Sequence, residues 1–328
     1  MASRASNLLR ITFAVALTAY LLYKSHPRAV AAALIGVSWR WIGLAVLLVL
    51  VDRALMAIRW IWLLRPVDPA RMPPTATLMR IFFVSTFVGS FLPASVGSDA
   101  VRTWQATERG VPGAQALASV LMDRVLGIAS ILIAAVAGFM VYPELLATRG
   151  ILLAFVAAIA GCVFALAFVF SSNWDTFVRR ALLPRLPQRL QPVLDRVLAA
   201  LQAYQGHHAT TLGVLAASLG VQMLRIVQAW CLGMSLGLAV PMSAYFGNIP
   251  IVLLVMLLPI SINGMGTSQL AFVWLFARGG VAEAPVFALS ALFVALGFVG
   301  NLPGALLFLT GHPDTARDAA PERPPRSR

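Results

Sequence analysis

The chain contains repeated long apolar stretches separated by short polar connections. About 20 apolar residues in a helix span the roughly 30 Å hydrocarbon core of a bilayer, because each residue advances about 1.5 Å. Only 11% of the residues are charged, whereas about one quarter are charged in an average soluble domain, so a soluble fold is excluded. The alternating strand pattern of a membrane β-barrel is not visible. The sequence therefore predicts an all-α, polytopic membrane helical bundle.

We expect about six full crossings, because that many apolar stretches run without interruption between polar flanks. They are Leu8–Tyr23, Trp41–Leu64, Ala114–Tyr142, Ile151–Phe170, Thr211–Gly237 and Pro285–Leu309. The first is interpreted as a retained helix rather than a signal peptide, because polar residues separate it from the nearest cleavage-like sequence. Residues 1–310 are predicted to form one transmembrane domain. Residues 311–328, which are rich in proline and charge, are predicted to form a disordered cytoplasmic tail with no room for a further domain.

Two further apolar stretches are predicted to be re-entrant hairpins rather than crossings. Ile81–Ser98 has arginines on both flanks, so the positive-inside rule places both of its ends in the cytoplasm. Tyr245–Arg278 is broken near its middle, and each half is too short to cross the hydrocarbon core. Its uncharged N-terminal flank is expected on the outer side. The two hairpins are therefore expected to enter from opposite faces of the membrane.

Basic residues set the predicted orientation. The segment Ser171–Ala209 carries more arginine than aspartate and is the clearest cytoplasmic marker. The N- and C-termini are accordingly expected in the cytoplasm of a plasma or inner membrane, which leaves the basic loop around Lys24 and Arg28 outside. Apolar residues at helical spacing between Leu190 and Leu201 predict either an amphipathic helix on the inner leaflet or a solvated connector.

The remaining composition favours lipid over other ligands. The net charge of +13 lies in the loops, where membrane orientation and anionic headgroups explain it better than nucleic acid. Cys162 and Cys231 have no metal-binding or redox spacing and are interpreted as packing residues. We recognise no metal-ligand cluster and no nucleophile paired with a base. We therefore expect no enzymatic activity, no metal and no cofactor.

The broken centres of the two hairpins have similar sequences, LPASVG at Leu92–Gly97 and LPISING at Leu258–Gly264. Proline removes an amide donor and glycine permits positive φ, so the backbone can unwind at membrane depth beside protein or a water-filled cavity. Similar broken helices that enter from opposite faces indicate an inverted repeat around a midplane binding site. Where each helix restarts, its first amides attract phosphate or carboxylate. Ser98 is the expected N-cap of one restart, and Thr267 or Ser268 that of the other.

Charged residues after the first hairpin tip are the strongest candidates for contact with a headgroup. Asp99 and Arg102 share a helix face, and they either bind a ligand or act as an ordinary cap beside a solvated arginine. Asp123 and Arg124 lie inside an apolar crossing, where charge is costly and marks a pathway. Because neighbouring residues face different directions, each requires a partner elsewhere, and we expect Arg124 to reach Asp99 or a ligand headgroup.

Other polar residues in the spans receive structural interpretations. Charge pairing inside the bundle is expected for Asp52, Arg53, Arg59 and Arg225, together with Gln222 and Gln228. Anchoring at the membrane interface is expected for Trp39, Trp41, Trp60, Trp62 and Trp174. The predicted substrate-binding set is Pro93, Ser95, Gly97, Ser98, Asp99, Arg102, Asp123, Arg124, Pro259, Ser261, Asn263, Gly264, Gly266 and Gln269.

Two runs of the chain resemble a known family. Arg80–Gly127, with Pro93, Gly97, Asp99, Arg102 and the sequence DRVLG from Asp123, resembles the flippase-like transmembrane region of lysylphosphatidylglycerol synthases. Leu258–Val281, with Pro259, Ser261, Gly264 and Gly266, is similar to the second signature of that family. The chain lacks the family's aminoacyltransferase domain, so the resemblance implies handling of a phospholipid or lipid-linked substrate without synthase activity. Ser98 and Ser268-Gln269 differ from the usual glycine and Arg-Glu, and the latter change leaves the second tip neutral.

These observations leave three functional hypotheses. The first is a lipid translocator in which Asp99, Arg102 and Arg124 contact the headgroup. The alternative is a non-transporting membrane partner that delivers lipid-linked substrate to a separate biosynthetic or lipid-modifying enzyme. A third is a transporter of a small soluble anion, which predicts a cavity closed to the lipid.

Overall fold

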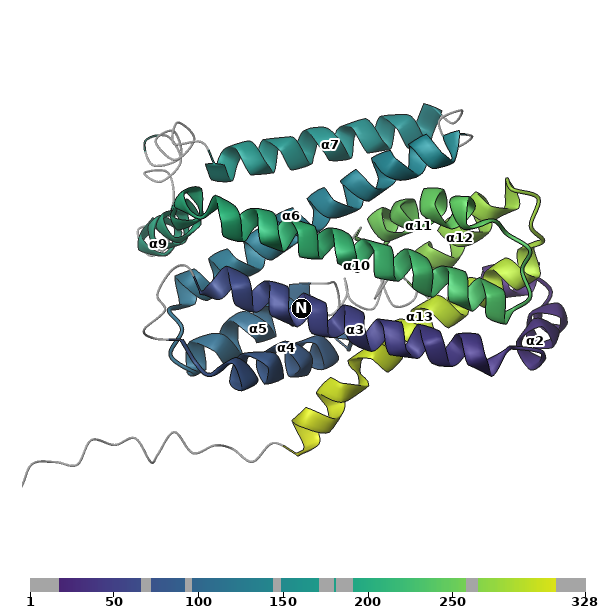
Figure 1. The fold of residues 1–328 in the computed structure, drawn as a ribbon, viewed down its shortest axis with the longest axis horizontal. Helices are drawn as coiled ribbons and strands as arrows, with labels where there is room; N and C mark the ends of the chain where they lie inside the picture. The colour runs from purple at the N-terminus through teal and green to yellow at the C-terminus, as the bar shows by residue number, and fades with distance from the viewer. Residues whose placement is uncertain are drawn as a thin grey trace, which may run out of the picture.

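The computed structural model describes residues 18–65, 72–91, 96–143, 149–170, 180, 191–257 and 265–310. Within these ranges the regular elements are all helical, and the long helices run side by side (Figure 1). Four described helices are long and apolar enough to cross a membrane: α3 (Trp39–Leu64), α6 (Gly113–Val141), α10 (His208–Ser235) and α13 (Glu283–Leu309). The predicted helical membrane bundle is thereby confirmed.

These helices begin and end within three residues of the predicted crossings, as does α7 (Arg149–Phe170) at the edge of the bundle beside α6. The remaining predicted crossing, Leu8–Tyr23, is described only from residue 18, and residues 18–24 are helical. It is followed by α2 (Pro27–Ile35) at the end of the bundle where α3 begins (Figure 1). The predicted tail at 311–328 lies outside the described residues.

Two pairs of short helices occupy opposite halves of the bundle. The first pair is α4 (Thr75–Gly89) and α5 (Val96–Glu108), near the end where α3 ends and α6 begins (Figure 1). The second is α11 (Met242–Leu257) and α12 (Thr267–Ala277), near the end where α10 ends and α13 begins (Figure 1). Helices of 11 to 16 residues are only about 17–24 Å long. We name each pair of contacting helices a hairpin, and neither helix of a pair is long enough by itself to cross a bilayer, whereas re-entry from one face of a membrane stays a prediction.

Both hairpins use a glycine on a long helix for close contact. An added Cβ at Gly304 of α13 would overlap the carbonyl oxygen of Phe83 on α4. An added Cβ at Gly138 of α6 would likewise overlap the carbonyl oxygen of Phe246 on α11. Small residues allow backbones to approach in this way when membrane helices pack. The first arm of each hairpin is thus seated against a long helix by equivalent contacts.

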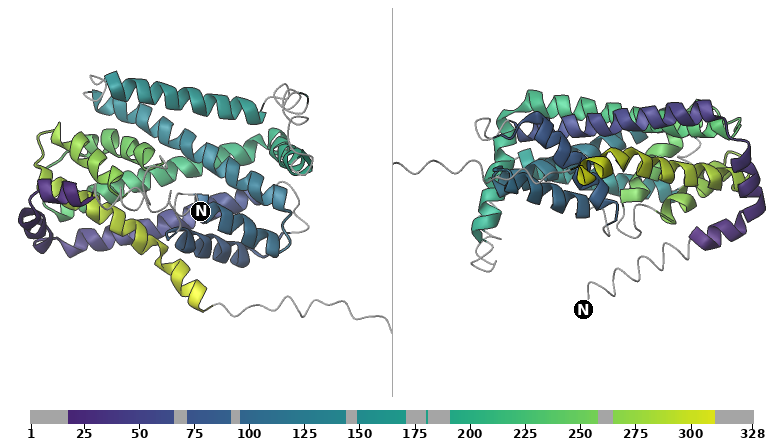
Figure 2. Two further views of the ribbon diagram at one scale, coloured as in Figure 1. Left: turned by 180° about the vertical axis from the view of Figure 1, so that it is seen from behind. Right: turned by 90° about the horizontal axis from the view of Figure 1, so that it is seen from below.

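The predicted amphipathic segment forms α9 (Gln191–Gln202), which lies across one end of the bundle (Figure 2). Val197 and Leu201 on its apolar face are buried in a cluster with Met122 of α6. In the following 3-10 helix (Ala203–Gly206), the hydroxyl of Tyr204 donates to the carbonyl oxygen of Leu63 at 2.6 Å. The predicted amphipathic helix is confirmed, the alternative of a solvated connector is wrong because the apolar face packs on protein, and the position on the inner leaflet stays a prediction.

The tryptophans fall into two groups. Trp39 and Trp62 are exposed, as interfacial anchors require. Trp41 instead packs edge-to-face against Trp230, with ring centroids 5.2 Å apart. Trp60 is fully buried and donates from Nε1 to Oγ of Ser119 at 3.2 Å, so its interfacial assignment is wrong. Trp174 lies outside the described residues.

Candidate functional site

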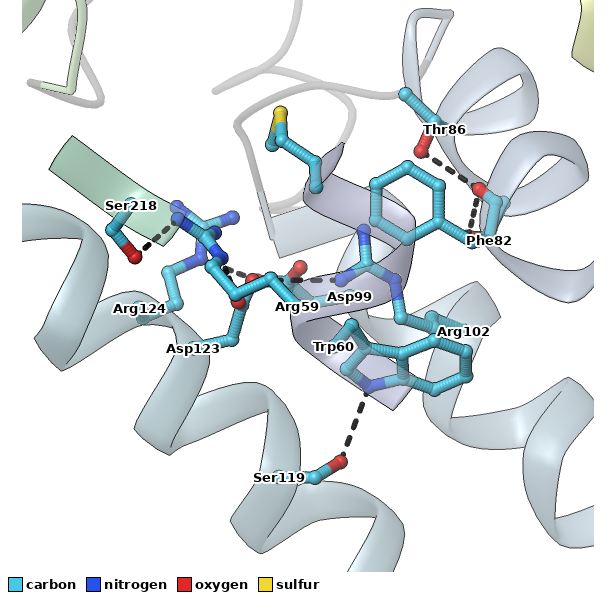
Figure 3. A network of polar contacts seen from close by, with 12 residues as sticks. Arg59, Trp60, Phe82, Thr86, Asp99, Arg102, Ser119, Asp123, Arg124 and Ser218 are labelled. Carbon is cyan, nitrogen blue, oxygen red and sulfur yellow. Dashed lines mark hydrogen bonds and ion pairs between the residues drawn. The ribbon is translucent and has the colours of Figure 1, made fainter. Parts of the chain in front are cut away.

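Three helices bring five charged side chains together in the middle of the apolar bundle (Figure 3). Asp99 and Arg102 come from α5, Asp123 and Arg124 from α6, and Arg59 from α3. Nε of Arg124 lies 2.5 Å from Oδ2 of Asp99. The contact expected between these two residues is confirmed. The adjacent Asp123 has other partners, as its different direction on the helix predicts.

Asp123 is shared by two arginines. Nε of Arg59 lies 2.7 Å from Oδ1, and Nη1 of Arg102 lies 3.7 Å from Oδ2. The N–H of Arg59 is not directed at Oδ1 as a hydrogen bond requires, so the pair is held by charge, with an unused donor and an unused acceptor. The charge pairing inside the bundle that the sequence predicts for Arg59 is present, but its partner, Asp123, was not predicted. The charge of Arg59 within an apolar span was the available signal, but sequence alone does not show that α3 reaches Asp123.

Arg102 lies between two aromatic rings (Figure 3). Its guanidinium carbon is 4.4 Å from the ring centroid of Phe82 and 5.3 Å from that of Trp60. The residue is only 5% exposed. Cation–π contact of this kind partly replaces the water that a buried arginine has lost. The reading of Arg102 as a solvated arginine at the membrane edge is therefore wrong.

The charged side chains of this network are deeply buried, so each would cost free energy of folding if it lacked a partner of opposite charge. Arg59, Arg102 and Asp123 are each less than 9% exposed, and Arg59 also donates to Oγ of Ser218 on α10 at 2.9 Å. A buried ion pair rarely adds net stability, whereas removing one partner costs about 3–5 kcal/mol. Charges kept inside a membrane bundle at this cost mark a candidate functional site.

A cavity of about 200 Å³ lies beside the network. Ser98, near the start of α5, and Leu257, the last residue of α11, both line it. The two interrupted apolar stretches therefore reach one cavity from opposite halves of the bundle. Its described lining includes four arginines and two aspartates, a formal excess of two positive charges. Such a cavity is suited to an anion.

The start of α5 differs in detail from the prediction. The helix begins at Val96, so Ser98 lies in its first turn rather than at its N-cap. Ser98 also lies directly against Gly89, the last residue of α4, where an added Cβ would overlap it. Gly97 precedes it in the same turn. The predicted contacts that lie outside the described residues are Pro93, Ser95, Pro259, Ser261, Asn263 and Gly264.

At the second hairpin, the described residues form the N-terminal cap of α12. Gly266, with φ of 82°, is the N-cap of α12, so the expected caps Thr267 and Ser268 are wrong. The backbone N–H of Gly266 donates to Oε1 of Gln269 at 2.5 Å, which is one half of a capping box. Neither Gly266 nor Gln269 is among the residues that line the cavity beside the network. Gln269 therefore has a capping role, and its contact with substrate stays a prediction.

A second cavity, of about 210 Å³, adjoins the first and shares Ile131, Arg225 and Leu257 with it. On its wall Asp52 is 1% exposed and pairs with Nη1 of Arg53 at 3.1 Å and with Nε of Arg225 at 3.3 Å. The predicted pairing of these charges is present. Their position on a cavity wall was not predicted, because it depends on how α3, α10 and α13 pack.

Comparison with known proteins identifies the family. No curated protein matches the chain. A family model described as the lysylphosphatidylglycerol synthase TM region matches residues 7–304, a range that includes both hairpins, the charged network and both cavities. The chain belongs to the family of lysylphosphatidylglycerol synthase transmembrane regions.

Proposed function

We propose that this protein binds and translocates the anionic headgroup of a phospholipid or lipid-linked substrate through the cavity beside the Arg124–Asp99 pair. One observation carries the proposal: a charged network with an excess of arginine lines a cavity, inside an apolar bundle, that both interrupted stretches reach. Membership of a family of membrane regions connected with lipid metabolism supports it. The proposal requires no chemical step, metal or cofactor.

The arginines supply the affinity in this proposal. Guanidinium groups bind phosphate oxygens through two parallel hydrogen bonds, which an ammonium cannot do. Arg124 and Asp99 are the more accessible pair, with side chains 31% and 18% exposed, whereas Arg59, Arg102 and Asp123 lie deeper. A phosphate entering the cavity competes with Asp99 for Arg124. Asp99 thus holds the arginine in place when the cavity is empty and releases it to the headgroup.

The hairpins supply the route. Irregular backbone between short helices is tolerated at membrane depth where it lines a polar cavity. In our proposal α4–α5 enters from the cytoplasmic face and α11–α12 from the opposite face, with both chain termini cytoplasmic. Each hairpin then controls access to the cavity from its own face, as in inverted-repeat transporters. The headgroup crosses through the cavity while the acyl chains remain in the bilayer.

Reconstitution into liposomes tests the proposal. Leaflet exchange of a labelled anionic phospholipid should fall at least about tenfold in Asp99→Asn, because the arginine loses the partner that positions it. The matched control Asp195→Asn makes the same change on α9, away from both cavities, and should exchange lipid at the wild-type rate. Equal exchange by wild-type and Asp99→Asn protein would overturn the assignment of this site.

The same preparation separates the other two hypotheses. Copurification with a synthase or glycosyltransferase, combined with no lipid exchange, would show the non-transporting partner instead. Uptake of inorganic phosphate into liposomes without lipid exchange would show a transporter of soluble anions.

A further inference from the structure

The second cavity contains polar atoms that the internal pairing leaves unused. Nε2 of Gln228, on α10, and Oδ1 of Asn301, on α13, are buried and have no hydrogen-bond partner among the described residues. Both side chains line the cavity around Asp52. The hydroxyl of Ser90 donates to the carbonyl oxygen of Thr86 at 3.0 Å, so it accepts from Nδ2 of Asn301 at 2.7 Å, and this network assigns Oδ1 as the amide atom without a partner. Nε of Arg53, which lines the same cavity, is also buried without a hydrogen-bond partner, so the described lining residues carry two unused donors and one unused acceptor.

Buried polar groups in folded proteins are nearly always hydrogen-bonded, so an unused donor and acceptor on one cavity wall indicate a ligand or ordered water. A hydroxyl group donates and accepts through the same oxygen. A headgroup that carries hydroxyls can therefore supply both an acceptor for Gln228 and a donor for Asn301. An ammonium group has donors only and satisfies just one of the two.

Charge in the cavities also disfavours an amine. The described walls of the two cavities together contain five arginines and three aspartates. Each aspartate already faces at least one arginine, and Asp52 and Asp123 face two each. A cationic headgroup would therefore have to compete with an arginine for every described carboxylate on these walls.

The volumes of the two cavities indicate that a single ligand occupies both of them. Each cavity is smaller than the roughly 300–1,000 Å³ usual for a small-molecule site, and the two together fall within that range. Because they share Arg225, a phosphate held by the arginine network can extend its substituent directly into the second cavity.

We propose that the second cavity is a specificity subsite, which recognises the neutral, hydroxyl-bearing part of a lipid headgroup and rejects an amine. This inference rests on the proposed function, in which a phosphate occupies the neighbouring network. Glycerol and sugar headgroups share the required chemistry. An ethanolamine headgroup has an ammonium in place of the hydroxyl, and an aminoacylated glycerol headgroup adds an ammonium to the one hydroxyl that it keeps.

Native mass spectrometry with an equimolar lipid mixture tests the subsite without requiring transport. The mixture contains phosphatidylglycerol, phosphatidylinositol, phosphatidylethanolamine, lysylphosphatidylglycerol and phosphatidic acid. We expect the glycerol or inositol lipid to be bound at least about fivefold more than each of the other three, the scale of one buried hydrogen bond. A preference for only one of the two distinguishes glycerol from sugar as the occupant. Equal binding of all five lipids, or a preference for an amine-bearing lipid, would overturn the subsite while leaving the proposed function intact.

Variants locate the preference within the protein. Gln228→Met and Asn301→Leu should each bring the ratio of phosphatidylglycerol to phosphatidic acid close to one. Gln115→Met is the matched control, because Gln115 is also a buried glutamine but lines neither cavity, and it should keep the wild-type ratio. Asp99→Asn should change the binding of all five lipids by the same factor and keep the preference, because each of the five lipids carries the phosphate that meets Arg124. A preference retained in both cavity variants would show that the subsite lies elsewhere, and failure of the wild-type protein to bind any lipid would overturn the proposed function with it.

Discussion

Arg124 on α6 and Asp99 on α5 are joined at 2.5 Å, and this pair connects the second arm of the first hairpin to a membrane-spanning helix. The two residues stand at the edge of the charged network, where their side chains are the most accessible among the five charged members. The pair therefore has two properties at once. It positions the hairpin, and it presents a guanidinium to the cavity.

Two substitutions of Arg124 distinguish the contribution of its positive charge from that of its guanidinium geometry. In Arg124→Lys the positive charge remains but bidentate contact with phosphate is lost, so lipid exchange should fall by about tenfold. Arg124→Gln should lower exchange further, because it also removes the charge. Liposome exchange rates provide the measurement, and Arg196→Lys on α9 is the control for a change of arginine to lysine outside the cavities. Wild-type exchange in Arg124→Lys would contradict recognition by a guanidinium.

Asp123 should contribute to stability rather than only to binding. Asp123→Ala leaves Arg59 and Arg102 buried without their shared counter-ion, which should destabilise the protein by about 3–5 kcal/mol. Thermal unfolding in detergent measures the effect. Adding Arg59→Met to Asp123→Ala should recover part of the loss, because one unpaired charge is removed. A double variant that is no more stable than the single variant would show that Arg59 and Asp123 are not coupled.

Adding a single methyl group at Gly304 should disturb the packing of α4 against α13. In Gly304→Ala the added Cβ meets the carbonyl oxygen of Phe83, so the helices must separate, and we expect destabilisation by about 1–3 kcal/mol. Gly161→Ala on α7 is the control, because no other group lies within 4 Å of an added Cβ there. The comparison uses thermal unfolding of both variants in the same detergent. Equal unfolding temperatures would contradict the close contact between α4 and α13.

Tyr204 should anchor the end of α9 to α3. Burial raises the pKa of its hydroxyl, which therefore stays protonated and donates to the carbonyl oxygen of Leu63 across the neutral range. Tyr204→Phe leaves that acceptor unpaired, and the expected loss is about 1–3 kcal/mol in thermal unfolding. The exposed Tyr23 allows the same substitution as a control that should have no effect. If Tyr204→Phe unfolds at the wild-type temperature, the anchoring role is wrong.

Much of the architecture followed from elementary constraints on the sequence. Apolar length predicts helices, because backbone polar groups have no other partner in hydrocarbon. The long helices accordingly begin and end close to their predicted bounds. The cost of burying charge singled out Asp123 and Arg124, and their adjacent positions on one helix showed that their partners must differ. On that ground Arg124 was expected to reach Asp99 or a ligand headgroup, and the structure shows the contact with Asp99.

Tertiary packing alone decided the remaining partners. Asp123 is shared by Arg59 and Arg102, Arg102 lies between Trp60 and Phe82, and the apolar face of α9 meets the bundle. Helical periodicity gives the direction of a side chain around its own helix axis. It does not say which distant helix lies in that direction, because that depends on how segments far apart in the chain cross and how closely their small residues allow them to approach. The sequence by itself therefore determined that this is a helical membrane protein with buried charges, and the tertiary structure decided how those charges surround two adjoining cavities.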